Sequence, residues 1–339
     1  MTGEPGSSAQ ADVAYGIDIG GTKVLGVALG TSDRIVAEAR VPTPPGQPTT
    51  SPVGAAVAEA VAEVVAQLDA ALGGAGSATH PPPIGVGAPG MVDRHGTLRF
   101  SPNLPQAGGV DWNLLIGDRL MGRSVLIEND ANFAAMAEHR LGAAQGYAHV
   151  LMVTLGTGIG GGLVVDGRVQ VGGNGFAGEI GHMVVDPAGP PCPCGRRGCW
   201  ERYASGGGLG LLAREAALAG NLPEVVKVSG GDPESVRGED VAAAALAGDA
   251  DARRVLQQVG WWIGFGLANL ACVLDPEIFV LGGGLVSAGD VLLDAARAAL
   301  AELVEGGSSR PEAPVVTAAF GERAGAVGAA LAARHGGLW

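Results

Sequence analysis

Apolar residues fall into two patterns along the first half of the chain: short runs typical of buried strands, and longer stretches with helical spacing. Residues 53–72 have the helical spacing and are followed by Gly73, a helix stop signal. A second helix follows the polar stretch 128–130. The strand-like runs are 13–30, which contains two strands around a glycine turn, and 33–42, 84–93 and 123–128. Strands that alternate with helices predict an α/β fold.

The second half begins by repeating the opening pattern. Residues 149–170 contain an apolar strand, a glycine turn, an apolar strand, an Asp-Gly turn and a strand, and the two glycine turns begin at Gly20 and Gly156. The later pattern predicts helices at 206–219, 240–247, 250–274, 289–305 and 324–335, with a strand and glycine turn at 277–286. The repeat predicts a duplicated α/β core, one copy in each of two domains, with a ligand cleft between them. The expected segments are a disordered tail at 1–13, a smaller N-terminal domain at 14–133 plus 324–339, and a larger C-terminal domain at 134–323.

Composition narrows the classes of partner. Apolar residues make up 47% of the 339 residues, enough for two cores. A net charge of -13 argues against nucleic acid or an anionic membrane as the main partner, while backbone amides can still bind a small anion. The chain lacks a bilayer-length apolar run, and its first residues lack the basic and apolar regions of a signal peptide. We therefore expect a cytoplasmic protein whose cysteines are reduced.

Two glycine turns are candidate phosphate sites. The stretch 16–23 is not a P-loop, because Thr22 separates the glycine from the lysine and a strand follows. The stretch 156–161 matches the dinucleotide fingerprint, but a hairpin follows where that fingerprint needs a helix. Either turn alone is as consistent with a plain tight turn. The matched pair favours a polyphosphate gripped from both sides, with Thr22 and Thr157 as hydroxyl donors.

Three of the four cysteines lie within eight residues. Cys192, Cys194 and Cys199 stand in a compact segment with prolines and glycines, and His182 lies ten residues upstream of Cys192. Three thiolates and one imidazole complete a tetrahedral zinc site. A zinc ion would replace the hydrophobic core that this polar, glycine-rich loop lacks.

Other interpretations of the cysteines are weaker. A disulfide leaves one cysteine unpaired, a redox pair favours C-x-x-C, and the neighbouring arginines and prolines do not resemble core. Zinc would fix Glu201 and Glu179, which flank the ligands. Cys272 is expected to be an ordinary core thiol.

A carboxylate and an amide stand where a buried strand gives way to a helix. Asn129 and Asp130 occupy this position, where α/β folds present ligands. Asp130 alone could be a helix N-cap. Beside phosphate-binding turns, it is a candidate to accept a proton from a hydroxyl nucleophile. Asn103, in a proline-rich loop, adds an amide suited to sugar hydroxyls.

The motifs DIGGTK, IEND, TLGTGIGGG, GEIGH and CPCGRRGCWE, in this order, resemble the ROK family of sugar kinases and repressors. Within it the chain is most similar to the ATP-dependent bacterial glucokinases. The resemblance extends from about residue 14 to the C-terminus, and the cysteine motif with its upstream GH is its most specific part. It implies the two-domain actin-like, ribonuclease H-like ATPase fold.

The resemblance also implies roles for individual residues. Asp130 would be the general base for the sugar 6-hydroxyl, and Asp18 would orient Mg²⁺ or its water. The sugar would also contact Asn103, Asn129, Glu179, His182 and Glu201. The phosphates would be surrounded by Gly21, Thr22, Lys23, Gly156, Thr157 and Gly158. The adenosine would lie by Gly282, Gly283 and Gly284. The structural zinc would be held by His182, Cys192, Cys194 and Cys199, with the second ring nitrogen of His182 facing the sugar.

The implied activity is transfer of phosphate from ATP to D-glucose, giving glucose 6-phosphate. The alternatives are kinases for N-acetylglucosamine, N-acetylmannosamine, fructose or allose, polyphosphate as donor, and a sugar-sensing repressor. The repressor is least favoured, because only about a dozen residues precede the first strand and the net charge is acidic. The relatives imply a homodimer or homotetramer.

Overall fold

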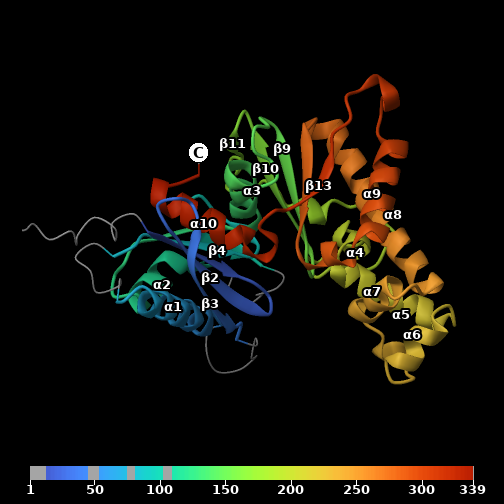
Figure 1. Ribbon diagram of the computed structural model, residues 1–339, viewed down its shortest axis with the longest axis horizontal. Helices are drawn as coiled ribbons and strands as arrows, with labels where there is room; N and C mark the ends of the chain where they lie inside the picture. The colour runs from blue at the N-terminus through green and yellow to red at the C-terminus, as the bar shows by residue number, and fades with distance from the viewer. Residues whose placement is uncertain (1–12, 45–52, 75–80, 102–108, 339) are drawn as a thin grey trace, which may run out of the picture. The chain divides into compact units, whose positions relative to one another are not determined.

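The computed structural model describes residues 13–44, 53–74, 81–101 and 109–338 (Figure 1). Its first elements are β1 (Ala14–Ile19), β2 (Lys23–Leu29), β3 (Ile35–Pro42), α1 (Val53–Ala71), β4 (Ile84–Ala88), β5 (Met91–Val92), β6 (Thr97–Phe100), β7 (Val110–Asp111), α2 (Trp112–Arg119), β8 (Val125–Asn129) and α3 (Asp130–Leu141). The chain continues with β9 (Val150–Leu155), β10 (Ile159–Val165), β11 (Arg168–Val169), the 3₁₀ turn η2 (Ile180–His182), α4 (Glu201–Ala204), α5 (Gly206–Leu218), α6 (Pro223–Val228), η3 (Pro233–Ser235), α7 (Gly238–Leu246) and α8 (Ala250–Leu274). It closes with β12 (Ile278–Gly282), η4 (Gly284–Ala288), α9 (Asp290–Leu303), η5 (Gly307–Ser309), β13 (Val315–Thr317), η6 (Gly321–Arg323) and α10 (Ala324–His335).

Two five-stranded sheets share one topology. Their strand orders are β3-β2-β1-β4-β8 and β11-β10-β9-β12-β13, and β5, β6 and β7 form a small third sheet. In the first sheet β1 pairs antiparallel with β2 and parallel with β4. In the second, β9 and β13 both pair parallel with β12. Both sheets thus arise from three consecutive strands followed by two parallel ones, which confirms the α/β class and the duplicated core.

Helices α1 and α10 cover opposite faces of the first sheet. Gly26 lies against Val64 of α1, where a Cβ would come within 2.3 Å of the valine side chain. Gly16, on the other face, lies against Ala326 of α10, where a Cβ would come within 1.8 Å of its carbonyl oxygen. Glycine at these positions lets both helices approach the sheet at backbone distance. The strand sides facing α1 carry the apolar core of this half.

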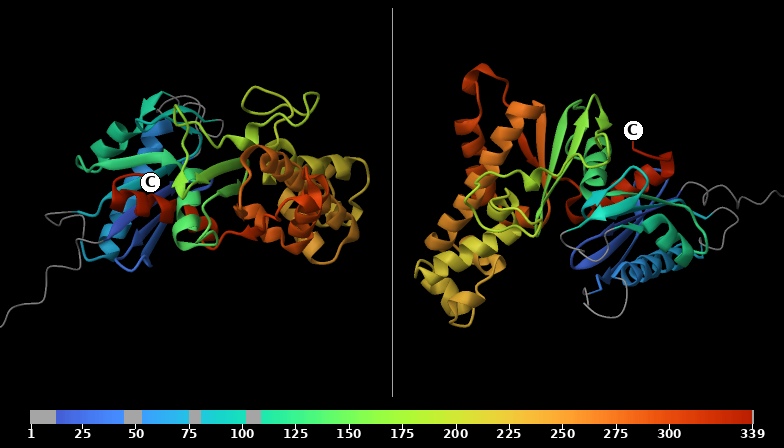
Figure 2. Two further views of the ribbon diagram at one scale, coloured as in Figure 1. Left: turned by 90° about the horizontal axis from the view of Figure 1, so that it is seen from above. Right: turned by 180° about the vertical axis from the view of Figure 1, so that it is seen from behind.

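Helices α8 and α9 pack closely in the second half of the chain (Figure 2). Gly260 and Gly264 of α8 face α9, where Cβ atoms would come within 2.5 Å of the Leu292 oxygen and 2.3 Å of the Ala296 oxygen. Cys272, near the end of α8, is exposed, so the expectation of a core thiol was wrong. The helical spacing at this position leaves its side chain on the solvent side.

The contacts divide the chain into two compact units. Unit 1 contains 1–148, 162–178 and 322–339, and unit 2 contains 149–161 and 179–321. Residues 134–148 and 162–178 thus contact unit 1, whereas the sequence suggested a C-terminal domain over 134–323. The domain bounds of the sequence analysis stay a prediction. In the described part of the chain, every helix is too short or too polar to cross a membrane.

Candidate active site

Asp18 and Asp130 lie side by side in unit 1. Asp18 is on β1 opposite Gly87 of β4. A Cβ at Gly87 would come within 3.3 Å of the Asp130 Cα, so the absence of a side chain there allows the start of α3 to reach the sheet beside Asp18. The carboxyl of Asp18 also lies against Gly325 of α10, where a Cβ would come within 2.9 Å of its Cγ. Two glycines therefore leave room for this carboxylate pair.

Both carboxyl groups of the pair have pKa values raised above that of an exposed aspartate. Burial, and then repulsion from Asp130, raise the pKa of Asp18 to about 8, although Lys23 lowers it. Burial raises the pKa of Asp130 to about 6, against the effect of the hydrogen bond from the Ala131 amide at 2.8 Å. The Oδ1 atom of Asp18 is buried without a hydrogen-bond partner in the described residues. A buried carboxylate with an unsatisfied oxygen suits a divalent cation or its water.

Asn129, not Asp130, caps helix α3. Its Oδ1 accepts hydrogen bonds from the amides of Ala131 at 2.9 Å and Asn132 at 3.1 Å, and its Nδ2 donates to the Gly90 oxygen at 3.0 Å. The cap role considered for Asp130 is thus filled by its neighbour, which leaves the second oxygen of Asp130 available for a substrate. Asn103, the other predicted sugar amide, lies outside the described residues.

The first glycine turn joins β1 and β2. Gly20 donates its amide to the Lys23 oxygen at 2.9 Å, and Thr22 is exposed at the tip. A Cβ at Gly21 would meet nothing within 4 Å, so the backbone there is open to a ligand. Lys23 forms an ion pair with Glu322 of η6. This turn belongs to unit 1 together with Asp18 and Asp130.

The second glycine turn, in unit 2, joins β9 and β10. The Gly156 amide donates to the Gly158 oxygen at 3.0 Å, and Thr157 is exposed. The predicted adenosine turn lies beside it, because Gly283 packs on Leu155, where a Cβ would come within 2.5 Å of the leucine oxygen. A Cβ at the neighbouring Gly284 would meet nothing within 4 Å. Unit 2 therefore brings together the second turn and residues 282–284.

The four predicted zinc ligands lie together in unit 2. The donor atoms of His182, Cys192, Cys194 and Cys199 all lie within 4.8 Å of one another. The Sγ of Cys192 is 3.7 Å from the Nδ1 of His182, and the sulfurs of Cys194 and Cys199 are 3.6 Å apart. Ligands bound to zinc at about 2.0–2.3 Å in a tetrahedron are separated by about 3.3–3.8 Å. The donor set and its spacing therefore fit zinc.

Backbone contacts give the knuckle, residues 192–201, its shape. Cys192 donates its amide to the Arg196 oxygen at 2.8 Å, and Trp200 donates to the Met183 oxygen at 2.8 Å. Gly198 has φ 63° and packs on Asp186, where a Cβ would come within 1.5 Å of the carbonyl oxygen. Glycine is thus required at this position both by its conformation and by space.

Glu201 joins the metal-ligand cluster to the second glycine turn. Its Oε1 accepts from the Cys192 thiol at 3.0 Å and lies 3.7 Å from the His182 Nδ1. Its Oε2 lies against Gly158, where a Cβ would come within 2.5 Å of it. Glu179 lies on the other side of His182, 3.9 Å from the Nε2. The imidazole therefore presents Nδ1 to the cysteines and Nε2 toward Glu179, as expected if one nitrogen serves a metal.

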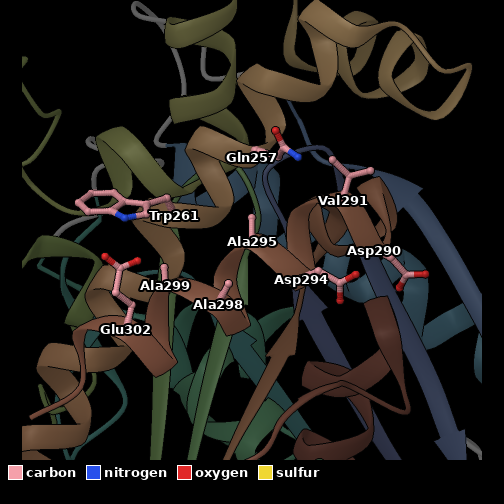
Figure 3. Close-up of a pocket in the computed structure, with 9 residues that line it drawn as sticks. All are labelled: Gln257, Trp261, Asp290, Val291, Asp294, Ala295, Ala298, Ala299 and Glu302. Carbon is pink, nitrogen blue, oxygen red and sulfur yellow. The ribbon is translucent and has the colours of Figure 1, made fainter. Parts of the chain in front are cut away.

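A surface groove of about 490 Å³ lies elsewhere on unit 2, between α8 and α9 (Figure 3). Trp261 stands on one side, and Asp290, Asp294 and Glu302 line the α9 side above a floor of alanines. This groove contains none of the predicted site residues. Its open, acidic lining is unsuited to the phosphates of a nucleotide.

Sequence reasoning missed two residues that shape these sites. Gly325 makes space for the Asp18 carboxyl, and Ser205 lies between the knuckle and the second turn. A signal for the second was present in the three glycines at 206–208. The first carried no local signal, because Gly325 is more than 300 residues from Asp18 along the chain.

Comparison with known proteins identifies the family. The ROK family pattern matches residues 14–335. The glucokinase of Streptomyces coelicolor is 37% identical over 332 residues, covering 95% of this chain and 98% of the relative. The N-acetylgalactosamine kinase of a Shewanella species is 33% identical over 329 residues, covering 94% and 95%. The solved ROK family glucokinase from Streptomyces griseus, in complex with glucose and AMPPNP, superposes with a TM-score of 0.84 at 35% identity, covering 95% of this chain and 99% of that one. With both glycine turns, the carboxylate pair and the metal-ligand cluster in place, this chain belongs to the ROK family and has its two-domain actin-like fold.

Proposed function

We propose that this protein is a glucokinase that transfers the γ-phosphoryl group of ATP to O6 of D-glucose, giving glucose 6-phosphate and ADP. The observation that carries the proposal is the Asp130 carboxylate beside Asp18, in a chain similar to glucokinases over nearly their whole length. The enzyme class, an ATP-dependent hexose kinase, follows from that likeness. The choice of glucose and the roles below are the proposal.

Asp130 is the general base. Its first oxygen is held by the Ala131 amide, so the second can accept the proton of the sugar 6-hydroxyl as this attacks the γ-phosphorus. A pKa raised to about 6 makes Asp130 a stronger base than an exposed aspartate while leaving it ionised at neutral pH. Asn129 fixes the start of α3 and so the position of Asp130.

Asp18 would hold Mg²⁺ or one of its waters. A divalent cation neutralises phosphate charge and orients the γ-phosphoryl group. Here it would also compensate the buried Asp18 carboxylate, whose Oδ1 has no partner among the described residues. The phosphates would be bound by backbone amides and side chains of Gly21, Thr22, Lys23, Gly156, Thr157 and Gly158, and the adenosine by Gly282, Gly283 and Gly284. Lys23 would exchange its ion pair with Glu322 for the nucleotide.

The sugar would be bound by Asn103, Asn129, Glu179, His182 and Glu201. Glu179, His182 and Glu201 adjoin one another around the metal-ligand cluster, which supports a shared role. Zinc held by His182, Cys192, Cys194 and Cys199 would be structural: it would fix the imidazole and the two carboxylates for the sugar without taking part in phosphoryl transfer. The Oδ1 of Asn129 already accepts two hydrogen bonds as the cap of α3, and its Nδ2 donates one hydrogen to the Gly90 oxygen. The second hydrogen on Nδ2 would therefore be the group that donates to a sugar hydroxyl.

A kinase for another hexose or for an N-acetylhexosamine is the second candidate, favoured by the 33% identity to an N-acetylgalactosamine kinase over 94% of this chain. The two candidates share the base, the turns and the metal cluster. An N-acetylhexosamine kinase would in addition need room for the acetamido group at C2 of the sugar.

The test is ADP release with Mg²⁺ and ATP across a panel of glucose, mannose, fructose, allose and the N-acetyl derivatives of glucosamine, mannosamine and galactosamine. We expect glucose to give the highest kcat/KM. We expect Asp130→Asn to lower kcat about 10²–10⁴-fold, as loss of a general base does. Asp290→Asn, which changes the first residue of α9, is the matched control and should leave kcat unchanged.

Each other result assigns a different function. An N-acetyl sugar ahead of glucose would replace glucose with an amino sugar. Turnover only with polyphosphate would change the donor. Sugar binding without turnover by the unaltered protein would indicate a sensing role, and full activity of Asp130→Asn would remove Asp130 as the base.

A further inference from the structure

Ser205 precedes helix α5, which begins with three glycines, and the roles proposed above do not explain these four residues. The Ser205 side chain is almost fully buried and its Oγ accepts the Gly208 amide at 3.0 Å, as an N-cap does. A cap needs no glycines after it. The run 206–208 therefore points to a close approach of some other part of the chain.

The group approached is the second glycine turn. The Gly206 amide donates to the Gly156 oxygen at 2.8 Å, and the Gly207 amide donates to the Thr157 oxygen at 3.2 Å. The Ser205 hydroxyl lies 3.0 Å from the same Thr157 oxygen. Two successive carbonyls of the turn are thus bound to the start of α5.

Those bonds fix the direction of the turn's amides. In a trans peptide the C=O and N–H groups point in opposite directions, and cis peptides are absent from the described residues. The Gly156 carbonyl shares its peptide with the Thr157 N–H, and the Thr157 carbonyl with the Gly158 N–H. These two N–H groups therefore point away from α5.

Side chains at 206 and 207 would break this arrangement. A Cβ at Gly206 would come within 2.9 Å of the Gly156 oxygen, and one at Gly207 within 2.6 Å of the Thr157 oxygen. Both distances are shorter than contacts that real Cβ atoms make, and the opposing atoms are backbone. Any residue larger than glycine would have to move the turn.

We propose that Ser205, Gly206 and Gly207 are positioning residues for the nucleotide: they hold the carbonyls of residues 156 and 157, and so direct the amides of Thr157 and Gly158 at the phosphates of ATP. This inference rests on the proposed function, which assigns the turn to the phosphates. The single hydroxyl hydrogen of Ser205 is shared between the Thr157 oxygen and the main-chain oxygen of Glu201, at 2.6 Å, so the same side chain ties the turn to α4.

The first test is Ser205→Ala in the full-length protein. Losing one hydrogen bond to the turn should weaken AMPPNP binding about tenfold, measured by calorimetry, and raise the KM for ATP by the same factor. The KM for glucose should stay within about twofold. The control is Ser235→Ala, which removes a hydroxyl that also bonds two carbonyls, of Ser229 and Asp232, on the exposed surface of the same unit.

A second pair of variants does not depend on Ser205. Gly207→Ala should weaken AMPPNP binding at least tenfold, because its Cβ displaces the Thr157 carbonyl. Gly210→Ala, on the same helix, places its Cβ at ordinary distances of 3.6 Å or more and should bind AMPPNP as the unaltered protein does. Melting temperature and zinc content show which variants are folded.

The outcomes separate this inference from the proposed function. Unchanged AMPPNP affinity in folded Ser205→Ala and Gly207→Ala proteins would overturn the inference, as would equal losses for glucose and nucleotide, which a merely structural role produces. AMPPNP binding needs no sugar turnover, so it tests the positioning role even if the unaltered protein phosphorylates no sugar. That last result would overturn only the proposed function.

Discussion

At the scale of single residues, burial of Asp18 and Asp130 has a cost in stability. Both carboxyls have pKa values raised above that of an exposed aspartate, chiefly because of burial. The folded protein therefore binds protons more tightly than the unfolded chain between about pH 4 and pH 8. Its stability falls as the pH rises through this range. Under the proposed function, a bound cation and the sugar would offset this cost.

Asp18→Asn should therefore stabilise the protein measured without Mg²⁺ or nucleotide. At pH 8 we expect a melting temperature higher by about 2–4 °C, corresponding to roughly 1 kcal/mol. At pH 5 the gain should be clearly smaller, because only the range between about pH 4 and pH 5 then contributes to the cost of burying Asp18. The control is Asp118→Asn, at an exposed aspartate of the same unit. An equal gain at both pH values would show that the effect is not due to the charge.

The sequence predicted the site residues whose interaction partners lie nearby along the chain. The metal-ligand cluster was predictable because its ligands lie within 18 residues, and the structure brings all four donor atoms together. The division of labour between Asn129 and Asp130 was not, since either side chain can cap a helix and only the backbone geometry decides. Ser205 was missed because its partner, Thr157, is 48 residues away.

At the scale of elements, α10 is held by glycines rather than by large side chains. Gly328 faces α3, where a Cβ would come within 1.8 Å of the Phe133 oxygen. Gly16 on β1 likewise lets α10 approach the first sheet closely, and Gly325 of α10 lies against the Asp18 carboxyl. The helix is therefore close to α3, to the sheet and to Asp18. The helix thus positions Asp18 through close packing.

Gly328→Ala should be strongly destabilising, because the added methyl group overlaps a backbone oxygen that cannot move without α3. We expect a loss of about 2 kcal/mol or more and a melting temperature lower by at least about 4 °C. Gly117→Ala is the control: it is also a helical glycine of unit 1, but its Cβ would lie 3.5 Å from the nearest atom. That variant should be neutral or slightly stabilised. Equal melting temperatures for the two variants would contradict close packing of α10.

Elements with a long periodic pattern were predicted well. Helices α8 and α10 have the predicted bounds, α1 ends one residue earlier than predicted, and α9 starts one residue later and ends two residues earlier. Helix α2 was missed, although Asp111 caps it by accepting the Leu114 amide at 3.1 Å. Eight residues give the apolar pattern too few turns to stand out. Strand β13, of three residues, is defined by pairing with β12, which a local pattern does not contain.

At the scale of the whole molecule, the repeat in the sequence predicted the repeat in topology. The matched turns at Gly20 and Gly156 lie at the same place in two sheets of identical strand order. Such repeats are visible because each half must build the same strand, turn and strand from the same kinds of residue. The knuckle between η2 and α4 is an addition to this plan in unit 2, and under the proposed function a zinc ion would stabilise it in place of a core of its own.

Loss of the metal should therefore affect one unit and leave the other intact. Trp200, next to the ligand Cys199, is fully buried and donates its Nε1 hydrogen to the Trp262 oxygen of α8 at 2.7 Å. A chelator, or Cys194→Ala, should remove the zinc, weaken glucose binding at least tenfold and speed amide exchange at residues 182–205 and around Trp262. Exchange in β1 and α1 should stay unchanged.

Hydrogen exchange followed by mass spectrometry measures both regions in one experiment, and metal analysis confirms the zinc content. Cys272→Ala is the control, since this exposed cysteine lies outside the cluster. If the zinc-free protein bound glucose normally, the metal would not position Glu179, His182 and Glu201. If exchange rose equally in β1 and α1, the metal would stabilise the whole protein rather than the knuckle. If the zinc is structural and positions the sugar-binding residues, its loss should speed exchange only in the knuckle and α8. Glucose affinity should fall in the same variants.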